Sequence, residues 1–239
     1  MWMATPGNIP AGNGVGMSRT DLTFYGDKFE SYFEGGRQDI VERLAANPDQ
    51  AILELGCGSG GTARAVRAAN KAGRYVGIEL MADAAKQAQG AVDQVVVGNV
   101  ESLDLQPFAG QFDVLIASEV LEHLVDPWAT VRRLVECLKP GAVVYASSPN
   151  VAHWHVVRAL LRGRFDYSEV GVMDRTHLRW FTPDTYRAMF EAAGVQVTSV
   201  ASVRPIGGKV RLLNALTGGR LSHLFMSQVM IVGIKRPIS

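Results

Sequence analysis

The feature that most constrains this chain is a glycine-rich turn between a short apolar run and a helical segment. Residues 51–61 are AILELGCGSGG, and residues 62–69 are rich in helix formers. Gly56, Gly58 and Gly61 satisfy the G-x-G-x-x-G pattern, in which a strand turns sharply into a helix. In an open α/β sheet this turn lies beyond the C-terminal ends of the strands, where ligands bind. The segment therefore predicts both a parallel sheet and the place of its ligand.

The rest of the chain alternates between strand-like and helix-like segments, which predicts a mostly parallel sheet covered by helices. We expect strands at 51–55, 75–79, 94–97, 112–117, 142–146, 195–203 and 227–235. We expect helices at 39–44, 62–69, 82–89 and 183–193, one that begins at Asp126-Pro127, and one between the last two strands. The alternation breaks at about 149–181, a segment rich in Trp, His, Arg and Phe. We expect this segment to be an insertion that acts as a lid over the substrate.

Length and composition favour a single domain after a short leader. With 239 residues, of which 47% are apolar and 20% are charged, the chain can bury a substantial core. We assign residues 1–20 to a flexible leader, because Gly, Pro and Asn are frequent there, and residues 21–239 to one domain. The apolar segment 210–216 suits either the core or a homodimer face, and the sequence leaves both open.

Charge, cysteines and hydropathy argue against several kinds of partner. A net charge of +1 gives no reason to expect nucleic acid or an anionic membrane. No apolar stretch approaches the roughly 18 residues that span a bilayer, and the N-terminus lacks the pattern of a secretion signal. Cys57 and Cys137 show neither metal-ligand spacing nor a disulfide framework. We therefore expect a cytoplasmic protein whose partner is a small molecule.

An acidic residue just before the glycines discriminates between two kinds of ligand. A dinucleotide would place its pyrophosphate at the N-terminus of the following helix, where Glu54 would repel it. A ligand with an ammonium group and no phosphate would be attracted instead, and S-adenosylmethionine is such a ligand. Glu79, at the end of the second predicted strand, can accept hydrogen bonds from a ribose diol, which NAD carries as well. Glu54 is thus the residue that favours S-adenosylmethionine as the cofactor.

Five motifs in order along the chain carry a resemblance to a known family. They are Glu54-Leu-Gly-Cys-Gly-Ser-Gly60, Val76-Gly-Ile-Glu79, Gly98-Asn-Val-Glu101, Phe112-Asp-Val-Leu-Ile-Ala-Ser-Glu-Val-Leu-Glu-His-Leu124 and Leu138-Lys-Pro-Gly141. From about residue 30 to its C-terminus, the chain resembles the class I S-adenosylmethionine-dependent methyltransferases. The resemblance implies an α/β, Rossmann-like fold: a seven-stranded, mostly parallel sheet with helices on both faces and an antiparallel last strand.

Two segments resemble particular branches of that family. The segment from Arg164 to Thr182 is similar to methyltransferases of polysaccharide and natural-product pathways. Glu119-Val-Leu-Glu-His123 resembles the ubiquinone-type O-methyltransferases and the MetW-like proteins. These likenesses imply that the methyl acceptor is a small molecule, with an oxygen of a sugar or a natural-product intermediate as the expected site.

The resemblance also implies which residues meet the cofactor. Those of the glycine turn lie at the methionine moiety: Glu54, Gly56, Cys57, Gly58 and Gly60. Those after the second and third strands lie at the adenosine: Glu79, Leu80, Asn99 and Val100. Those after the fourth strand line the methyl-transfer site: Ser118 and Glu119. Cys57 has no adjacent base, so we assign no chemistry to its thiol.

Two of the implied contacts carry a specific expectation. Asn99 stands where the family often has Asp, so its bond to the adenine amino group should survive in weakened form, because Asn keeps an acceptor oxygen but no charge. Tyr32 and Arg37, in Tyr32-Phe-Glu-Gly-Gly-Arg37, match a recurrent family pattern, and Arg37 can pair with the cofactor's carboxylate. The alternative is a helix that simply packs on the sheet.

Histidines are the candidates for acid–base chemistry, because methyl transfer to a hydroxyl often needs a base near neutral pH. His177 follows Asp174-Arg-Thr, and the carboxylate of Asp174 could orient its imidazole and raise its basicity. The alternative is that both residues only order the insertion. His123 follows the fourth strand near the active edge of the sheet, either as a second catalytic candidate or as a packing residue.

We expect no metal site. His153 and His155, two residues apart, could ligate one cation from a strand. However, no Cys or carboxylate cluster lies nearby, and the stretch follows Pro149-Asn150 in what we expect to be a loop. A wall of the acceptor pocket is the better interpretation, in which Trp154 and Trp180 offer apolar or sugar-stacking faces.

Together these observations predict an S-adenosylmethionine-dependent methyltransferase of a small-molecule oxygen. Within the same fold, N- or C-methylation is an alternative, because fold does not fix the acceptor. An NAD-dependent dehydrogenase would share the glycine pattern and Glu79, although Glu54 argues against it. A cofactor-binding regulatory protein without turnover would retain all the cofactor motifs.

Overall fold

The computed structural model describes residues 36–204, 214 and 217–237. The predicted leader, Tyr32 and most of the helix predicted between the last two strands lie outside the described residues. The described residues belong to the compact unit Gly35–Ser239.

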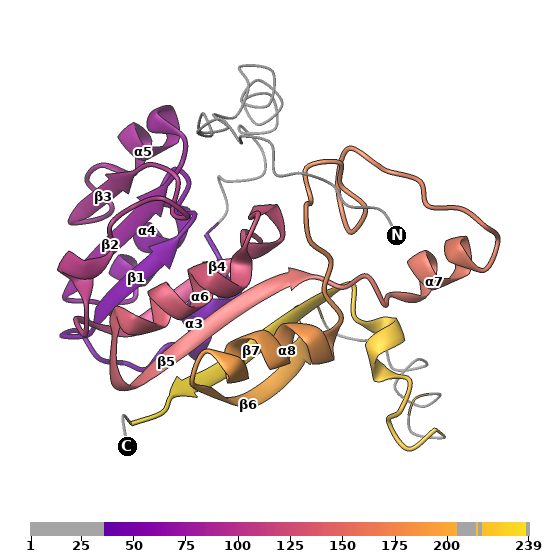
Figure 1. Ribbon diagram of the computed structural model, residues 1–239. Coiled ribbons are helices and arrows are strands. Elements are labelled where there is room, and N and C mark those ends of the chain that lie inside the picture. Colours follow the sequence, from indigo (N-terminus) through magenta and orange to yellow (C-terminus); the bar gives the residue numbers. More distant parts are fainter. Residues whose placement is uncertain (1–35, 205–213, 215–216, 238–239) are drawn as a thin grey trace, which may run out of the picture. The chain divides into compact units, whose positions relative to one another are not determined.

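Seven strands form one sheet in the order β3-β2-β1-β4-β5-β7-β6 (Figure 1). Their bounds are β1 Ala51–Leu55, β2 Arg74–Glu79, β3 Gln94–Val97, β4 Phe112–Ser118, β5 Leu138–Pro149, β6 Val195–Ser202 and β7 Gln228–Lys235. The pairs among β1 to β5 are parallel, and β7 runs antiparallel to both β5 and β6. The predicted fold class, including the antiparallel last strand, is confirmed.

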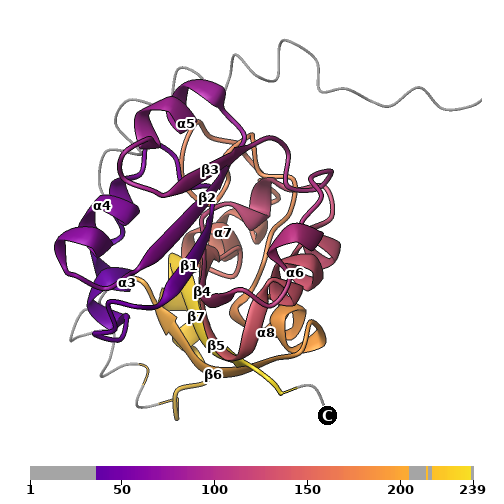
Figure 2. The ribbon, with the colours of Figure 1, turned by 90° about the vertical axis from the view of Figure 1, so that its left-hand side faces the viewer.

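Helices cover both faces of the sheet. The described α-helices are α3 Gln38–Arg43, α4 Gly61–Ala68, α5 Ala82–Ala88, α6 Pro127–Glu136, α7 Trp154–Leu160 and α8 Pro183–Ala192. The 3₁₀ helices are η1 Gln106–Phe108, η2 Leu121–His123 and η3 Ser222–Phe225. Viewed along the sheet, α3, α4 and α5 lie on one side of the strands, and α6 and α8 lie on the other (Figure 2).

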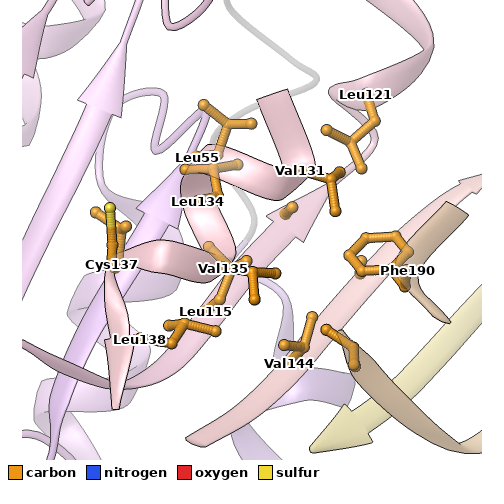
Figure 3. Packing of buried hydrophobic residues seen from close by; sticks show 14 of the residues in the cluster. Leu55, Leu115, Leu121, Val131, Leu134, Val135, Cys137, Leu138, Val144 and Phe190 are labelled. Carbon is orange, nitrogen blue, oxygen red and sulfur yellow. The ribbon is translucent and has the colours of Figure 1, made fainter. Parts of the chain in front are cut away.

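A separate apolar core lies on each face, because buried side chains of a strand alternate between its two faces. One core joins Leu53 and Leu115 to Val131 and Leu134 of α6 and to Phe190 of α8, and Figure 3 shows much of it from close by. The other core joins Ile52 and Ile116 to α3 and α4. Both cores hold the strands in register, so that the C-terminal ends of β1, β2 and β4 meet at one edge of the sheet.

Several helix ends follow the expected local chemistry. The Asp126 side chain accepts a hydrogen bond from the Ala129 N–H at 2.9 Å, so it caps α6 as predicted, with Pro127 in the first turn. Thr182 and Thr185 form a capping box at the start of α8. At the end of α8, Gly194 adopts a φ of +88°, which is the left-handed conformation that terminates many helices.

The structure corrects two predicted boundaries. β5 runs from Leu138 to Pro149 instead of 142–146, because β7 pairs with it as far as Pro149. The segment His153-Trp-His155, which we expected in a loop, begins α7, with His153 as its N-cap residue. Val156 is buried while its neighbours in α7 are not, which shows that a single apolar contact anchors this short helix.

The insertion is tied to the sheet at its first residues. Asn150 is fully buried, and its Nδ2 donates hydrogen bonds of 2.7 Å to the carbonyl oxygens of His223 and Met226. Its Oδ1 accepts a hydrogen bond from the Ala152 N–H at 2.9 Å. The end of β5 is thereby fixed to the segment that leads into β7.

Among the described residues, no helix is both long and apolar enough to cross a membrane.

Candidate active site

The glycine turn forms a tight backbone cradle at the end of β1. Gly56, Gly58 and Gly60 have φ values of +71°, +52° and +85°, which glycine adopts without steric cost. The Gly56 N–H donates a hydrogen bond to the Ile78 carbonyl at 2.8 Å, which joins the turn to β2. A Cβ atom added to Gly60 would lie 3.0 Å from the Cβ of Ala91. The turn therefore leaves room for a ligand only by dispensing with side chains.

Glu79 is held at the end of β2 by two backbone donors. Its Oε2 accepts a hydrogen bond from the Gly58 N–H at 2.8 Å, and its Oε1 accepts one from the Met81 N–H at 2.9 Å. The side chain is buried, so both oxygens stay in fixed positions. Each carboxylate oxygen retains a second lone pair. Glu79 can therefore accept hydrogen bonds from a ribose diol without giving up the bonds that orient it.

Glu54 lies buried next to the glycine turn. Its Oε2 accepts a hydrogen bond from the Tyr75 hydroxyl at 2.7 Å, and Tyr75 is itself fully buried. Burial raises the pKa of Glu54 to about 7, although the hydrogen bonds from Tyr75 and Thr62 act in the opposite direction. At neutral pH this carboxyl group is poised between its two forms, and a nearby ammonium group would favour the charged form.

Arg37 lies at the same edge, above the ends of β4 and β5. Its guanidinium pairs with Asp39 through Nε–Oδ1 and Nη2–Oδ2 distances of 2.8 Å. Its Nη1 donates to the Ser147 hydroxyl at 2.7 Å and also hydrogen-bonds with Ser118. Burial raises the pKa of Asp39, but the bonds and charge of Arg37 outweigh this effect, so the pKa is lowered overall. The predicted cation thus lies at the predicted edge, already paired with a carboxylate.

The residues predicted at the adenine follow β2 and β3. Leu80 exposes 38% of its surface, whereas Val100 is buried in the core on the α6 face. The Asn99 side chain is exposed, and its Oδ1 accepts a hydrogen bond from the Glu101 N–H at 2.9 Å. This local turn orients the amide of Asn99, and its oxygen has a second lone pair for an amino group.

The thiol of Cys57 points away from the cradle. The side chain is buried, and a Cβ added to Gly77 would lie only 2.4 Å from the Cys57 Sγ. Burial raises the pKa of Cys57 far above its usual value, with further contributions from Glu54 and Glu79. The thiol is therefore inert, and only the backbone of Cys57 can serve a ligand.

The chain turns sharply where β4 ends. Glu119 has a φ of +52°, a conformation that is rare for residues other than glycine and often found at functional sites. Its Oε2 accepts a hydrogen bond from the Gln228 amide at 3.0 Å, whereas its buried Oε1 has no hydrogen-bond partner among the described residues. Burial raises the pKa of Glu119. Ser118 meanwhile contacts the Ser147 hydroxyl at 3.0 Å.

Glu122 is a site residue that the sequence did not single out. It exposes 1% of its surface, and neither carboxylate oxygen has a hydrogen-bond partner in the described part of the chain. Burial, followed by the charge of Glu119, raises the pKa of Glu122 well above its usual range. Its backbone carbonyl accepts hydrogen bonds from the Leu178 and Arg179 N–H groups, at 2.8 and 3.0 Å. η2 therefore anchors the far end of the insertion.

The same contact brings the two predicted histidines together. The His123 and His177 rings meet edge to face, with centroids 4.8 Å apart. The Nδ1 of His123 lies 3.1 Å from the Thr176 carbonyl, and the Nδ1 of His177 lies 3.0 Å from the Val172 carbonyl. Because a carbonyl can only accept, each Nδ1 carries a proton and each Nε2 carries the lone pair.

Asp174 is adjacent, in the same turn of the insertion. Its Oδ1 accepts hydrogen bonds from the Thr176 N–H and hydroxyl at 2.9 and 2.8 Å, and its backbone carbonyl accepts from the His177 N–H at 3.1 Å. Asp174 and His177 are both buried. Asp174 therefore shapes the turn that presents His177, and its predicted effect on the basicity of His177 stays a prediction.

Trp180 and the residues near it form an aromatic group on the insertion. Phe165 and Tyr167 lie with ring centroids 5.8 and 6.2 Å from Trp180, respectively, and 5.5 Å from each other. Trp180 also donates a hydrogen bond to the Val172 carbonyl at 3.3 Å. The insertion thus presents aromatic rings near the histidine pair, and the role of Trp180 as a wall of the acceptor pocket stays a prediction.

Comparison with known proteins agrees with the fold and with this edge of the sheet. The family defined as a methyltransferase domain matches residues 29–200. A ubiquinone biosynthesis O-methyltransferase of Idiomarina loihiensis is 25% identical over 197 residues, which cover 79% of this chain and 75% of the relative. A trans-aconitate 2-methyltransferase of Deinococcus radiodurans is 25% identical over 177 residues, covering 71% and 67%. The crystal structure of a SAM-dependent methyltransferase from Archaeoglobus fulgidus superposes with a TM-score of 0.59 at 20% identity, covering 88% of this chain and 100% of that chain.

A seven-stranded sheet with this order and a glycine cradle at the ends of β1 and β2 defines the class I methyltransferase fold. The family match spans most of the chain, and the protein belongs to the methyltransferase family. The cofactor of this family is S-adenosylmethionine, so the resemblance seen in the motifs is confirmed. The dehydrogenase alternative is thereby set aside.

The residues around the cradle fit this cofactor. Glu79 presents an oriented carboxylate that can accept hydrogen bonds from a ribose diol, and Glu54 provides a carboxyl group beside the glycine turn, which would repel a phosphate. Sequence reasoning missed Tyr75 and Thr62, because they act through Glu54 and Arg37, which lie elsewhere in the chain, and it also missed Glu122. Glu122 lies within the quoted Glu119–His123 motif, but nothing in the sequence indicates that its carboxylate is buried without a partner.

Proposed function

We propose that this protein transfers a methyl group from S-adenosylmethionine to an oxygen of a small molecule, with a sugar or a natural-product intermediate as the acceptor. The observation that carries the proposal is the juxtaposition of the cofactor cradle and the histidine pair at one edge of the sheet, since β1, β2 and β4 all end there. The names of the O-methyltransferase relatives support oxygen as the acceptor atom.

On the cofactor side, the oriented carboxylate of Glu79 binds the ribose hydroxyls, and Glu54 faces the ammonium group. Gly56, Gly58 and Gly60 let the backbone approach the methionine moiety, and Arg37 exchanges part of its pairing with Asp39 for the cofactor's carboxylate. Leu80, Val100 and Asn99 surround the adenine. When bound, S-adenosylmethionine supplies the methyl group on a positively charged sulfur.

On the acceptor side, the backbone of Ser118 and Glu119 lines the approach to the methyl group. The Nε2 atoms of His123 and His177 carry lone pairs that can accept the hydroxyl proton of the acceptor. Asp174 keeps His177 in place through the turn of the insertion. Trp180, with its aromatic neighbours, offers a stacking face for a ring of the acceptor.

The test is a screen with S-adenosylmethionine labelled on its methyl group against matched acceptors: sugars, phenols, carboxylic acids, amines and carbon nucleophiles. We expect label on oxygen, and a loss of about 10²–10⁴ in kcat in His177→Ala, because a positioned proton acceptor contributes that much. His223→Ala, in η3, is the matched control and should retain its rate, because the backbone carbonyl that Asn150 contacts is kept. Transfer to nitrogen or carbon would overturn the proposed acceptor. Tight cofactor binding without turnover on any class would favour the regulatory alternative.

A further inference from the structure

A compact group of three potential metal ligands lies at the junction of η2 and the insertion. Glu122, His123 and His177 each offer one ligand atom, and these atoms lie within 4.8 Å of one another. Glu122 and His177 are buried and His123 is half-buried, so the group is partly shielded from bulk water. Two imidazoles and one carboxylate form a ligand set that proteins use for divalent transition metals, in open sites that keep a position for substrate or water.

The buried Glu122 carboxylate lacks the interactions that usually compensate for burial. A buried polar group without a hydrogen bond costs about 1–3 kcal/mol, and most such groups in native proteins are satisfied. Neither oxygen of Glu122 makes a hydrogen bond of normal geometry to a described residue, although the side chain is almost completely enclosed. The Ser148 hydroxyl and the Glu122 N–H lower the pKa of this carboxyl group, but burial outweighs them. A cation at this position would supply the missing interaction for both oxygens.

The histidines are held in the tautomer that a metal requires. The Nδ1–H group of His123 donates to the Thr176 carbonyl and that of His177 donates to the Val172 carbonyl, which leaves the lone pair of each ring on Nε2. A backbone carbonyl on the far ring nitrogen is the usual outer partner of a metal-bound histidine, where it fixes the ring orientation. Both rings therefore have the support expected around a metal centre.

We propose that Glu122, His123 and His177 bind a divalent transition metal ion of the zinc class, with three protein ligands and at least one open position. Ligand atoms about 2.0–2.2 Å from zinc lie roughly 3.5 Å apart, so closure from the observed spread needs shifts of about 1 Å in the side chains. The sequence predicted no metal site, so this proposal departs from that prediction. Its ligands come from two segments that are far apart in the chain, whereas His153 and His155 had been the only pair with a local spacing.

The role of the ion rests on the proposed function. At the open position the ion binds the acceptor hydroxyl and lowers its pKa, as it does for bound water. The hydroxyl proton leaves to water, and the oxygen keeps its electron pair for the bond to the incoming methyl group. With the ion bound, His123 and His177 act as ligands, and the ion replaces their Nε2 atoms as the agent that activates the acceptor.

The experiment measures metal binding apart from turnover. Full-length protein is treated with EDTA, dialysed against Zn²⁺ and analysed for metal content, and the visible spectrum of the Co²⁺-loaded protein reports the coordination. We expect one ion per chain in the wild type, and at least tenfold weaker Zn²⁺ binding in Glu122→Gln and in His177→Ala. His155→Ala is the matched control for surface histidines and should bind as the wild type does.

Titration of S-adenosylmethionine into the same samples separates this proposal from the proposed function. Cofactor binding in a variant that has lost Zn²⁺ shows that the variant is folded and that the metal site alone was removed. Failure of the wild type to retain Zn²⁺ or Co²⁺ while it binds the cofactor would overturn the metal site and leave the proposed function standing. Equal Zn²⁺ binding by the wild type and by both ligand variants would place the ion elsewhere and would also overturn the site.

Discussion

Buried carboxylates occur in two regions of the same sheet edge, and their surroundings differ. On the β1–β2 side, Glu79 accepts two backbone N–H groups and Glu54 accepts the Tyr75 hydroxyl. On the β4 side, Glu119 has one satisfied oxygen, and Glu122 has none among the described residues. In the first region the buried carboxylates accept hydrogen bonds from the protein itself. In the second region, buried carboxylate oxygens lack hydrogen-bond donors among the described residues.

The difference separates two tasks of the protein. A cofactor that is the same in every turnover is best met by groups that are already oriented, because no reorganisation is then needed on binding. Groups that act on the reacting atoms are commonly left partly unsatisfied, and their cost to stability is offset elsewhere in the fold. The distribution of satisfied and unsatisfied carboxylates thus agrees with the proposed division into a cofactor side and an acceptor side.

The largest effect is expected from Glu79→Ala, which removes the acceptor of the ribose diol. Two hydrogen bonds to a charged group contribute about 3–6 kcal/mol together, so the affinity for S-adenosylmethionine should fall by at least about a hundredfold. Isothermal titration calorimetry measures this directly. Asp83→Ala is the control, because Asp83 is an exposed carboxylate of α5 paired with Lys86. Unchanged affinity in Glu79→Ala would show that the cradle holds the cofactor by other groups.

The second effect is a dependence of stability on pH from Glu54. Its pKa is raised to about 7 in the folded chain, so the folded state binds more protons than the unfolded state between about pH 4.5 and pH 7. As the pH rises from about 4.5 to 7, the free energy of unfolding should therefore fall by about 3 kcal/mol. Above pH 7 Glu54 should cause no further change. Denaturant titrations of the wild type and of Glu54→Gln test this, because the variant should lack that part of the slope.

The raised pKa of Glu54 also predicts that a proton is released when the cofactor binds. At about pH 6.5 most of this carboxyl group is protonated, and an ammonium group beside it would shift it to the charged form. Calorimetric titrations in two buffers with different ionisation enthalpies should report release in the wild type and less in Glu54→Gln. Equal release in both proteins would assign the proton to another group and remove Glu54 from the ammonium site.

The smallest expected effect is on stability, when a buried glutamate in each of the two regions is replaced by methionine. In metal-free protein, Glu122→Met should stabilise the fold by about 1–2 kcal/mol, because an apolar side chain of similar size replaces a buried group without partners. Glu79→Met should destabilise the fold by about 1–3 kcal/mol, because the Gly58 and Met81 N–H groups lose their acceptor. Thermal and denaturant unfolding measure both. Destabilisation by Glu122→Met would show that its carboxylate is satisfied in solution.

Most of the fold follows from local patterns in the sequence. The strands and the glycine turn were predicted within a few residues, because apolar runs, glycines and proline caps act over short distances. The length of β5 was missed, because it depends on pairing with β7, which is far away in sequence. α7 was also missed, because a single buried valine supports it in a segment with few other helix signals.

The positions of candidate site residues could be predicted where the residue belongs to a motif at the end of a strand. Glu54 lies near the end of β1, Glu79 is the last residue of β2, and each belongs to a motif, so their positions at the edge could be inferred from the chain alone. The partners that set their chemistry, such as Tyr75 and the Gly58 N–H, depend on strand register. Glu122 could not be inferred, because a carboxylate inside η2 is usually exposed, and its burial depends on the insertion that covers it.

The anchor of that insertion has a consequence for how such proteins diversify. Leu178 and Arg179 are held by the Glu122 carbonyl through main-chain hydrogen bonds, which do not depend on the identity of either side chain, and the Arg179 side chain adds a hydrogen bond to the Val125 carbonyl. Loops of other length or composition could replace the segment between Asn150 and Ser168, provided that the turn over 168–177, which holds His177 through Val172 and Asp174, is kept. The first half of the insertion can then change, in evolution or by design, apart from the turn that presents His177.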